Sequence, residues 1–408
     1  MPSSLHHEAI ADTPGRGRTL LLVWEMGEGF AHAARLLWIA RRLVRAGWHP
    51  VVAARDPATL RAEYEAEGIE VFPAPPHESC FTGKPPFRAA SYADVMGVCG
   101  YADRDRLTAL VAAWDDLLAQ YRPAAIIADY SPLLSLAAFR RIPLIPIGDG
   151  FVVPPVLPEG GFPPLGTIQP DVWSPAALLA NACAVQEKRG QPLPDSLHQI
   201  VSGVGGVVSI PSELDIYADW RTEPAAGPWE RPEAPLPAPA APRFFGYLRM
   251  NHPQARQTVK ALIDTGMPGE LFLRNIQPGM ATALAGELRA AGILLHETPP
   301  LIREALARAS LFIHHGGIGS LTDAATAGRM QLLLPRHREQ TCNAKRALET
   351  LPGCFVAGER TSAATLRTQL PKLISNRQAF RRAQECAARF AARPGTAWMA
   401  LQPLLARI

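Results

Sequence analysis

The most distinctive residues of the chain for binding chemistry follow an apolar stretch at 311–314 (LFIH). They are His315, Gly316, Gly317, Gly319 and Ser320. Glycines between a strand and a helix let a ligand approach backbone N–H groups, and the positive end of the helix dipole favours a phosphate. A histidine at the same turn can donate a hydrogen bond or a positive charge to that anion. The turn therefore predicts a phosphate-binding site.

A second set of residues, Glu339, Gln340 and Asn343, follows the next apolar stretch of the chain, 331–334. Parallel strands end at a common edge of their sheet, where ligands bind, so we expect both sets to lie there. Taken alone, the glycines could form only a tight turn, and Ser320 with Asp323 only a capping box. The second set favours a binding site over this structural alternative.

A histidine and an aspartate could supply acid–base chemistry in the N-terminal half. His32 follows the apolar stretch 19–25 within the segment 27–32 (GEGFAH), and Asp129 ends another apolar stretch, AIIAD. A neutral imidazole can take a proton from an attacking hydroxyl, and a carboxylate can orient its other nitrogen. The structural alternatives are that each residue only caps the helix that follows it.

The elements that must position these residues alternate between short apolar strands and amphipathic helices. The expected strands lie at 19–25, 49–54, 69–74, 125–128, 142–147, 243–249, 270–274, 293–295, 311–314 and 331–334. The first helix is expected at about 33–46. This alternation predicts an α/β chain with two parallel, right-handed, doubly wound sheets, each of the Rossmann type.

The expected domains follow from a shift in composition. The segment 223–242 is rich in proline and alanine, which indicates a semi-rigid linker. We expect a flexible tail at 1–18, Rossmann-like domains at 19–222 and 243–385, and C-terminal helices at 386–408. These last helices either close the second domain or cross back to the first.

Composition and charge exclude several classes of protein. At 408 residues the chain is long enough for two or three domains, and 41 basic against 37 acidic residues are spread too evenly for a nucleic-acid binder. The six cysteines form no CxxC pair, and no metal-ligand spacing occurs, so reduced thiols in a cytoplasmic protein are expected. The basic helix around 41–45 is expected to be a solvated face, with peripheral membrane contact as the alternative.

The segment 311–343 resembles the donor-site signature of the GT-B glycosyltransferases of family 1, which include plant, macrolide and other natural-product enzymes. That signature is H-x-G-x-x-S-x-x-E, followed by an acidic residue with glutamine and then by an asparagine. The matching residues here are His315, Gly317, Ser320, Asp323, Glu339, Gln340 and Asn343. Asp323 replaces the usual glutamate and Glu339 the usual aspartate, which puts the sugar selectivity in question.

This resemblance implies two Rossmann-like domains that face a cleft, with the acceptor bound by the N-terminal domain and a nucleotide sugar by the C-terminal one. The pyrophosphate is assigned to His315 and the turn 316–320, and sugar hydroxyls to Glu339 and Gln340. Asp323 would hold the ribose. Arg249, at the end of a strand, could pair with pyrophosphate, or it could simply be solvated.

The resemblance also implies the reaction. His32 would be the general base and Asp129 its partner, although the family normally carries G-x-G-H where this chain has GEGFAH. The expected activity is transfer of a sugar from a UDP- or dTDP-sugar to a hydroxyl of a small-molecule or lipid acceptor. The reaction is also expected to invert the configuration at the sugar and to need neither a metal ion nor a cofactor beyond the nucleotide sugar.

Three other functions stay open from the sequence. A nucleotide-sugar epimerase could share the two-domain fold and would need no acceptor. A catalytically silent glycosyltransferase-like partner is the second, and the departures around GEGFAH keep it open. A nicotinamide-dependent oxidoreductase is the third, because GEGFAH superficially matches GxGxxG, with Asp56 as the acid for the ribose. In this chain His32 occupies the position of the third glycine of the GxGxxG motif.

Overall fold

The computed structural model describes residues 17–408 except 28–29, 84–86, 159, 167–169 and 359. Most of the predicted tail therefore lies outside the described residues. The chain divides into two compact units. The first contains the chain up to Ser209 together with Asp219–Ala226 and Ala397–Ile408, and the second contains Ile210–Ala218 and Gly227–Thr396.

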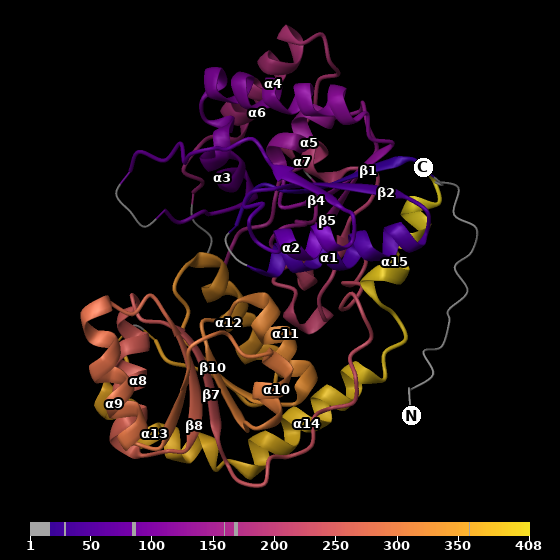
Figure 1. Cartoon of the computed structure of the whole chain (residues 1–408). Coiled ribbons are helices and arrows are strands. Elements are labelled where there is room, and N and C mark those ends of the chain that lie inside the picture. Colours follow the sequence, from indigo (N-terminus) through magenta and orange to yellow (C-terminus); the bar gives the residue numbers. More distant parts are fainter. Residues whose placement is uncertain (1–16, 28–29, 84–86, 159, 167–169, 359) are drawn as a thin grey trace. The chain divides into compact units, whose positions relative to one another are not determined.

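The first unit is built on a six-stranded parallel sheet with the order β3-β2-β1-β4-β5-β6 (Figure 1). Its strands are β1 (Thr19–Trp24), β2 (His49–Ala54), β3 (Glu70–Pro73), β4 (Ala125–Asp129), β5 (Leu144–Gly148) and β6 (Val207–Val208). β1 and β4 lie at the centre and are buried along nearly their whole length. Apolar runs without alternation are typical of strands covered on both faces, which explains why the sequence revealed them.

Helices cover both faces of this sheet, with α1, α2 and α15 on one face and α4–α7 on the other (Figure 1). The helices that precede the linker are α1 (Phe30–Arg45), α2 (Arg61–Ala66), α3 (Tyr92–Met96), α4 (Arg104–Tyr121), α5 (Pro132–Ala138), α6 (Pro175–Lys188) and α7 (Leu197–Ser202). A π-helical turn, Gly97–Tyr101, lies between α3 and α4. α1 begins three residues earlier than the sequence predicted, so His32 belongs to its first turn.

The second unit repeats the architecture with the order β12-β11-β10-β7-β8-β9. The strands are β7 (Phe244–Arg249), β8 (Gly269–Arg274), β9 (Ile293–His296), β10 (Leu311–His314), β11 (Met330–Leu333) and β12 (Cys354–Val356). The helices are α8 (Pro253–Thr265), α9 (Ala281–Ala290), α10 (Ile302–Ala307), α11 (Ile318–Ala327), α12 (Arg338–Thr350), α13 (Ala363–Ile374) and α14 (Arg377–Ala391). One buried cluster packs α8, α9 and α13 on the sheet, and a second packs α10 and α11 on the opposite face. The predicted pair of doubly wound sheets is confirmed; β6 and β12, of two and three residues, were missed.

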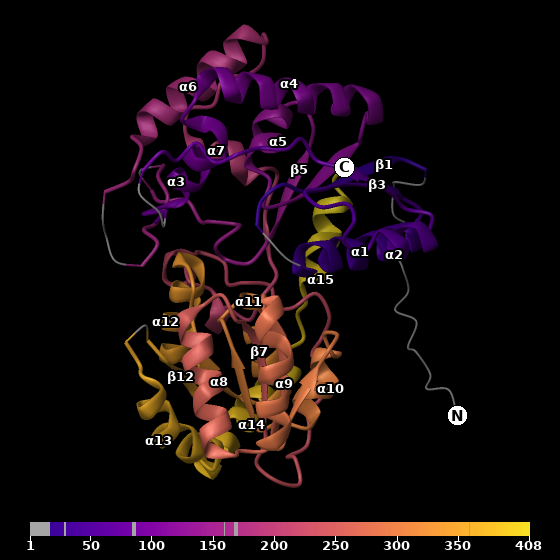
Figure 2. The same ribbon diagram turned by 60° about the vertical axis from the view of Figure 1, so that its left-hand side comes forward.

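The last helix, α15 (Ala397–Leu405), belongs to the first unit, whereas α14 belongs to the second (Figure 2). Trp398 of α15 meets Trp38 of α1 edge to face at 5.9 Å, and the Arg42 guanidinium lies 3.9 Å from the centre of the Trp38 ring. The carbonyl of Ile408 accepts a hydrogen bond of 2.8 Å from Arg18. The helices expected at 386–408 are thus divided between the two units.

The helices and the cysteines of the chain have ordinary character. Within the described part of the chain, no helix has the length and apolar character that crossing a membrane requires. The six cysteines are free thiols, and four of them are buried.

A buried carboxyl group joins β1 to α5. Glu25, which is 1% exposed, accepts hydrogen bonds from the backbone N–H groups of Leu133 (3.0 Å) and Leu134 (2.9 Å). Burial raises the pKa of the Glu25 carboxyl from 4.5 to about 8, although the two N–H donors act to lower it. In the folded chain this group therefore keeps its proton to a much higher pH than in the unfolded chain.

Glu25→Gln should flatten the pH dependence of stability between pH 5 and pH 8. Because the folded pKa is the higher one, the stabilisation from Glu25 is complete below pH 4.5 and is lost as the pH rises through about 8. The free energy of unfolding should fall by up to about 1.4 kcal/mol per pH unit in this window, and the glutamine should remove that slope. Denaturant unfolding at several pH values measures it. Glu67→Gln, in an exposed ion pair with Arg41, is the control, and equal slopes for wild type and Glu25→Gln would contradict the assignment.

Candidate active site

His32 and Asp129 meet at the carboxyl edge of the first sheet. β1 and β4 pair in parallel, with Trp24 opposite Asp129, so the start of α1 lies beside the end of β4. His32 Nδ1 is 3.0 Å from Asp129 Oδ2, and the aspartate is fully buried. The structure thus brings together the two residues that the sequence paired. The N-cap of α5 is Ser131, so the alternative in which Asp129 caps that helix is wrong.

The second ring nitrogen of His32 points at a glycine. A Cβ atom on Gly27 would lie only 2.8 Å from His32 Nε2. The indole of Trp24 stacks on the imidazole, with 5.3 Å between ring centres and 11° between planes. Asp129 and Trp24 therefore fix the orientation of the ring, and the missing side chain at Gly27 leaves room at Nε2. A nitrogen in this position can accept a proton from a hydroxyl group.

Arg35 is a member of the cluster that the sequence analysis missed. One turn after His32 on α1, its Nη1 donates a 2.7 Å hydrogen bond to the same Asp129 oxygen. Although burial acts to raise it, Arg35 and His32 hold the pKa of Asp129 below its ordinary value. Residues three apart share one side of a helix, so the spacing of His32 and Arg35 was a signal that could have revealed the contact.

A second carboxyl group, Asp149, lies just after β5 at the same edge of the sheet. It is 7% exposed, and its Oδ1 accepts a hydrogen bond of 3.0 Å from the N–H of Val152. Burial raises the pKa of Asp149, while Arg35 opposes this effect. The sequence analysis did not single out this residue either.

A series of aromatic rings begins beside His32. Tyr130 is 6.4 Å from His32, Phe151 is 5.7 Å from Tyr130, and Tyr92 is 6.4 Å from both Tyr130 and Phe151. Phe162 extends the series at 5.3 Å from Tyr92. These rings give the surroundings of His32 an apolar and aromatic character.

In the second unit, the glycine turn leads into α11 as the sequence predicted. α11 begins at Ile318 with Gly317 as its N-cap, so the alternative of a capping box at Ser320 and Asp323 is wrong. Gly316 has φ +81°, and no atom lies within 4 Å of a Cβ built on Gly317 or Gly319. The backbone at the start of this helix is therefore open to an anion.

His315 holds three strand ends together. Its Nδ1 lies 2.8 Å from the Leu334 carbonyl, after β11, and its Nε2 accepts a 2.8 Å hydrogen bond from the Arg249 N–H, at the end of β7. Burial, opposed by the Leu334 hydrogen bond, lowers the pKa of His315 to about 4, and Arg336, His252 and Arg249 lower it further. Without a bound anion the imidazole is therefore neutral at neutral pH, and the role of His315 in holding an anion stays a prediction.

The remaining predicted donor residues gather at this same edge of the second sheet. Glu339 and Gln340 lie in the first turn of α12, where Gln340 Oε1 accepts a hydrogen bond of 3.0 Å from the Arg336 N–H. Asn343 is buried and donates a 3.3 Å hydrogen bond to the carbonyl of Gly316. Asp323 is exposed on α11. Their roles in binding remain predictions.

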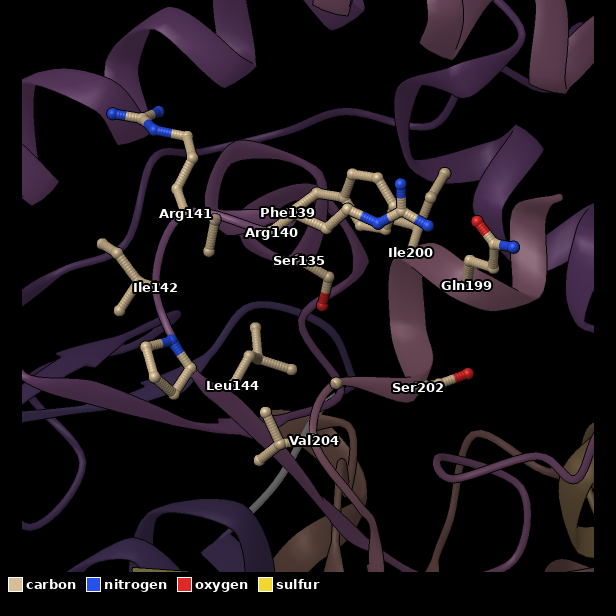
Figure 3. A pocket seen from close by; sticks show the side chains of 13 residues that line it. Ser135, Phe139, Arg140, Arg141, Ile142, Leu144, Gln199, Ile200, Ser202 and Val204 are labelled. Carbon is tan, nitrogen blue, oxygen red and sulfur yellow. The ribbon is translucent and has the colours of Figure 1, made fainter. Parts of the chain in front are cut away.

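The described residues hold no group of three or more His, Cys, Asp or Glu side chains that could bind a metal ion. A cavity of about 510 Å³ in the first unit is lined by residues such as Phe139, Arg140 and Ile200 (Figure 3). It lies beside Leu144, where β5 begins, and none of the predicted site residues lines it.

Comparisons with known proteins agree with this arrangement. Residues 284–402 match the family model described as erythromycin biosynthesis protein CIII-like, C-terminal domain. No curated protein matches the sequence of the chain. The structure of the glycotransferase of kitacinnamycin is similar, with 19% identity, a TM-score of 0.67, and 96% of this chain and 99% of that chain covered.

Two other solved structures are similar over nearly their whole length. Glycosyltransferase VinC in complex with dTDP has 18% identity and a TM-score of 0.68, with 95% of this chain and 99% of that chain covered. Spinosyn rhamnosyltransferase SpnG complexed with spinosyn aglycone has 16% identity and a TM-score of 0.59, with 94% and 99% covered. A structure of SpnG complexed with thymidine diphosphate is similar to the same extent.

The chain has the GT-B fold. The predicted resemblance to the GT-B glycosyltransferases of family 1 is confirmed, and the predicted enzyme class agrees with the names of all three structures. The matched residues 284–402 include the glycine turn and all of α12. Within this GT-B chain, the family model thus covers the segment that carried the resemblance.

His315→Ala should weaken the binding of thymidine diphosphate about tenfold. The substitution removes the two hydrogen bonds through which His315 anchors the Arg249 backbone and the Leu334 carbonyl beside the glycine turn, and a resulting loss of about 1.4 kcal/mol in binding free energy corresponds to tenfold. His315→Gln, which can still donate and accept, should fall between wild type and alanine. Isothermal calorimetry with thymidine diphosphate measures the affinities, and thermal unfolding shows whether each variant is folded. Wild-type affinity in folded His315→Ala would refute this role.

Gly27→Ala should reduce turnover by up to about 100-fold, because the new methyl group displaces the His32 ring from its position. Gly27 also has φ +83°, so alanine there costs some stability in any case. Gly68→Ala is the matched control, since Gly68 has φ +67° and nothing within 4 Å of its Cβ position. Steady-state rates and unfolding midpoints of both variants separate the two effects. If both variants lose stability and turnover equally, the space at Nε2 has no role.

Proposed function

We propose that this chain transfers a sugar from a nucleotide sugar to a hydroxyl group of a natural-product acceptor, with inversion and without a metal ion. The observation that carries the proposal is the His32–Asp129 pair, with Nδ1 bound to the carboxylate and space at Nε2. In a single displacement, Nε2 takes the proton of the acceptor hydroxyl. The hydroxyl oxygen attacks the anomeric carbon, and the bond from that carbon to the nucleoside diphosphate breaks.

The second unit supports binding of the leaving diphosphate. The open N-terminus of α11 offers backbone N–H groups, and the positive charges of Arg249 and Arg336 lie close enough to His315 to lower its pKa. Such donors stabilise charge that develops on a leaving group, which is the work a metal ion performs in other enzymes. In this proposal Glu339 and Gln340 bind sugar hydroxyls and Asp323 binds the ribose.

Thymidine is the nucleoside we favour over uridine. Two of the similar structures, VinC and SpnG, are complexes with thymidine diphosphates, and SpnG also binds spinosyn aglycone. The aromatic rings that continue from His32 to Phe162 suit a large apolar acceptor of that kind. The domains at 19–222 and 243–385 would bind acceptor and donor, respectively.

The rival functions make different use of the first unit. An epimerase converts its nucleotide sugar without an acceptor, and a silent partner needs no base. A silent partner does not require an imidazole with one nitrogen oriented and the other left with space, so the pair of His32 and Asp129 favours an enzyme. An epimerase also needs acid–base groups, but it needs them beside its nucleotide sugar, and the predicted donor residues lie on the other unit.

His32→Ala should reduce turnover by roughly 10²–10⁴-fold, because it removes the group that takes the acceptor proton. Affinity for the donor should stay close to that of wild type, since the predicted donor residues lie on the other unit. Asp129→Asn should cause a smaller loss, because the imidazole remains while its orienting charge is gone. The donor is found first, by thermal stabilisation with a panel of nucleotide sugars, and product is then followed by mass spectrometry with polyketide aglycones.

Each result bears on one part of the proposal. Stabilisation by a dTDP-sugar with no product from any aglycone would favour the epimerase, which an NMR assay of the sugar alone detects. No stabilisation by any nucleotide sugar would favour the silent partner. Normal turnover in folded His32→Ala would reject the assignment of the base.

A further inference from the structure

One oxygen of Asp129 carries two partners. His32 Nδ1 lies 3.0 Å from Oδ2, and Arg35 Nη1 donates to the same atom at 2.7 Å. The other oxygen, Oδ1, is buried and has no hydrogen-bond partner among the described residues. The side chains of His32 and Arg35 are 15% and 13% exposed, so water screens this cluster only weakly.

The two partners compete for the same negative charge. A carboxylate beside an imidazole stabilises the protonated ring, which can no longer take a proton. A guanidinium is always charged, and it occupies the same carboxylate oxygen at a shorter distance. It therefore reduces the stabilisation that Asp129 can give to a charged His32, while both hydrogen bonds keep the carboxylate in place.

We propose that Arg35 is a positioning residue that holds the Asp129 carboxylate and keeps the His32 imidazole neutral, and so able to accept a proton, at neutral pH. This inference rests on the proposed function, in which His32 is the base. Arg35 touches neither the acceptor nor the donor in this scheme and acts only through Asp129.

The other groups around the cluster do not replace Arg35. Asp149, from the loop after β5, is a second carboxyl group whose charge also interacts with His32 and Arg35. Tyr64 of α2 donates its hydroxyl to the carbonyl of Ala33, and burial together with the charge of Asp129 raises the pKa of Tyr64, so it stays neutral. Trp24 and Tyr130 face the ring without charge. Arg35 is thus the permanent cation in direct contact with Asp129.

The decisive experiment follows the titration of the His32 imidazole by NMR in the full chain with labelled histidine, without any substrate. The His32 signal is assigned as the one that disappears in His32→Gln. In Arg35→Gln, the midpoint of the His32 titration should move upward by about one pH unit, because Asp129 then interacts with His32 alone. Arg35→Lys keeps the positive charge and should restore most of the wild-type midpoint.

Two further variants make the result specific. Arg41→Gln, on the same helix, breaks an exposed ion pair with Glu67 and should leave the His32 titration unchanged. Arg35→Met is a second uncharged variant, for the case in which Arg35→Gln fails to fold. An unmoved or lowered midpoint in the uncharged variants would overturn the proposal, and so would a lysine variant that behaves like the glutamine variant.

Activity gives the second measurement. Once an acceptor that the enzyme glycosylates is known, kcat/KM is measured against pH. In Arg35→Gln the midpoint of its acidic limb should move to higher pH by the same amount as the NMR midpoint. A purely structural role for Arg35 would lower kcat/KM equally at every pH and leave the profile in place. Because the NMR titration needs no turnover, a shifted midpoint in a chain without transferase activity would uphold the role of Arg35 and reject the proposed reaction.

Discussion

The parallel pairing of β1 with β4 is the constraint on which the candidate active site depends. It sets Trp24 opposite Asp129, so the last residues of two central strands and the first turn of α1 share one edge of the sheet. Trp24 and Asp129, the last residues of these two strands, both contact the His32 ring. A shift of this register by one residue would turn Asp129 to the other face of the sheet and remove the carboxylate from His32.

In the second unit, parallel strand pairing likewise brings the predicted site residues to one edge of the sheet. β7, β10 and β11 are neighbours in the sheet, and the neutral ring of His315 joins the backbone at their carboxyl ends. Asn343 ties the turn at Gly316 to α12. The glycine turn is therefore held by the hydrogen bond from Asn343 on one side and by those of the adjacent His315 on the other. The backbone N–H groups at the start of α11 are thereby held in fixed positions, which is the condition that the proposed stabilisation of a leaving diphosphate requires.

Most of the fold could be predicted from the sequence, because its parallel strands are buried on both faces and are uniformly apolar. Ten of the strands were predicted in this way, whereas β6 and β12 are too short for a pattern to show. The start of α1 was placed too late because GEGFAH contains two glycines, which suggest a loop. The contact between His32 and Asp129 was predictable because both residues end or follow apolar strands of one sheet.

The contacts that the sequence could not reveal are those in which a predicted residue has a second partner. Nothing in the sequence shows that both ring nitrogens of His315 bind backbone atoms. Likewise, Arg35 stands among other arginines on α1; its spacing from His32 indicates a shared side of the helix, but only the structure shows that it reaches Asp129. Arg35 lies one turn from His32 and reaches the buried Asp129, whereas Arg41 lies further along and reaches the exposed Glu67. The direction of each side chain from the helix axis thus decides whether an arginine acts on the base or only on solvent.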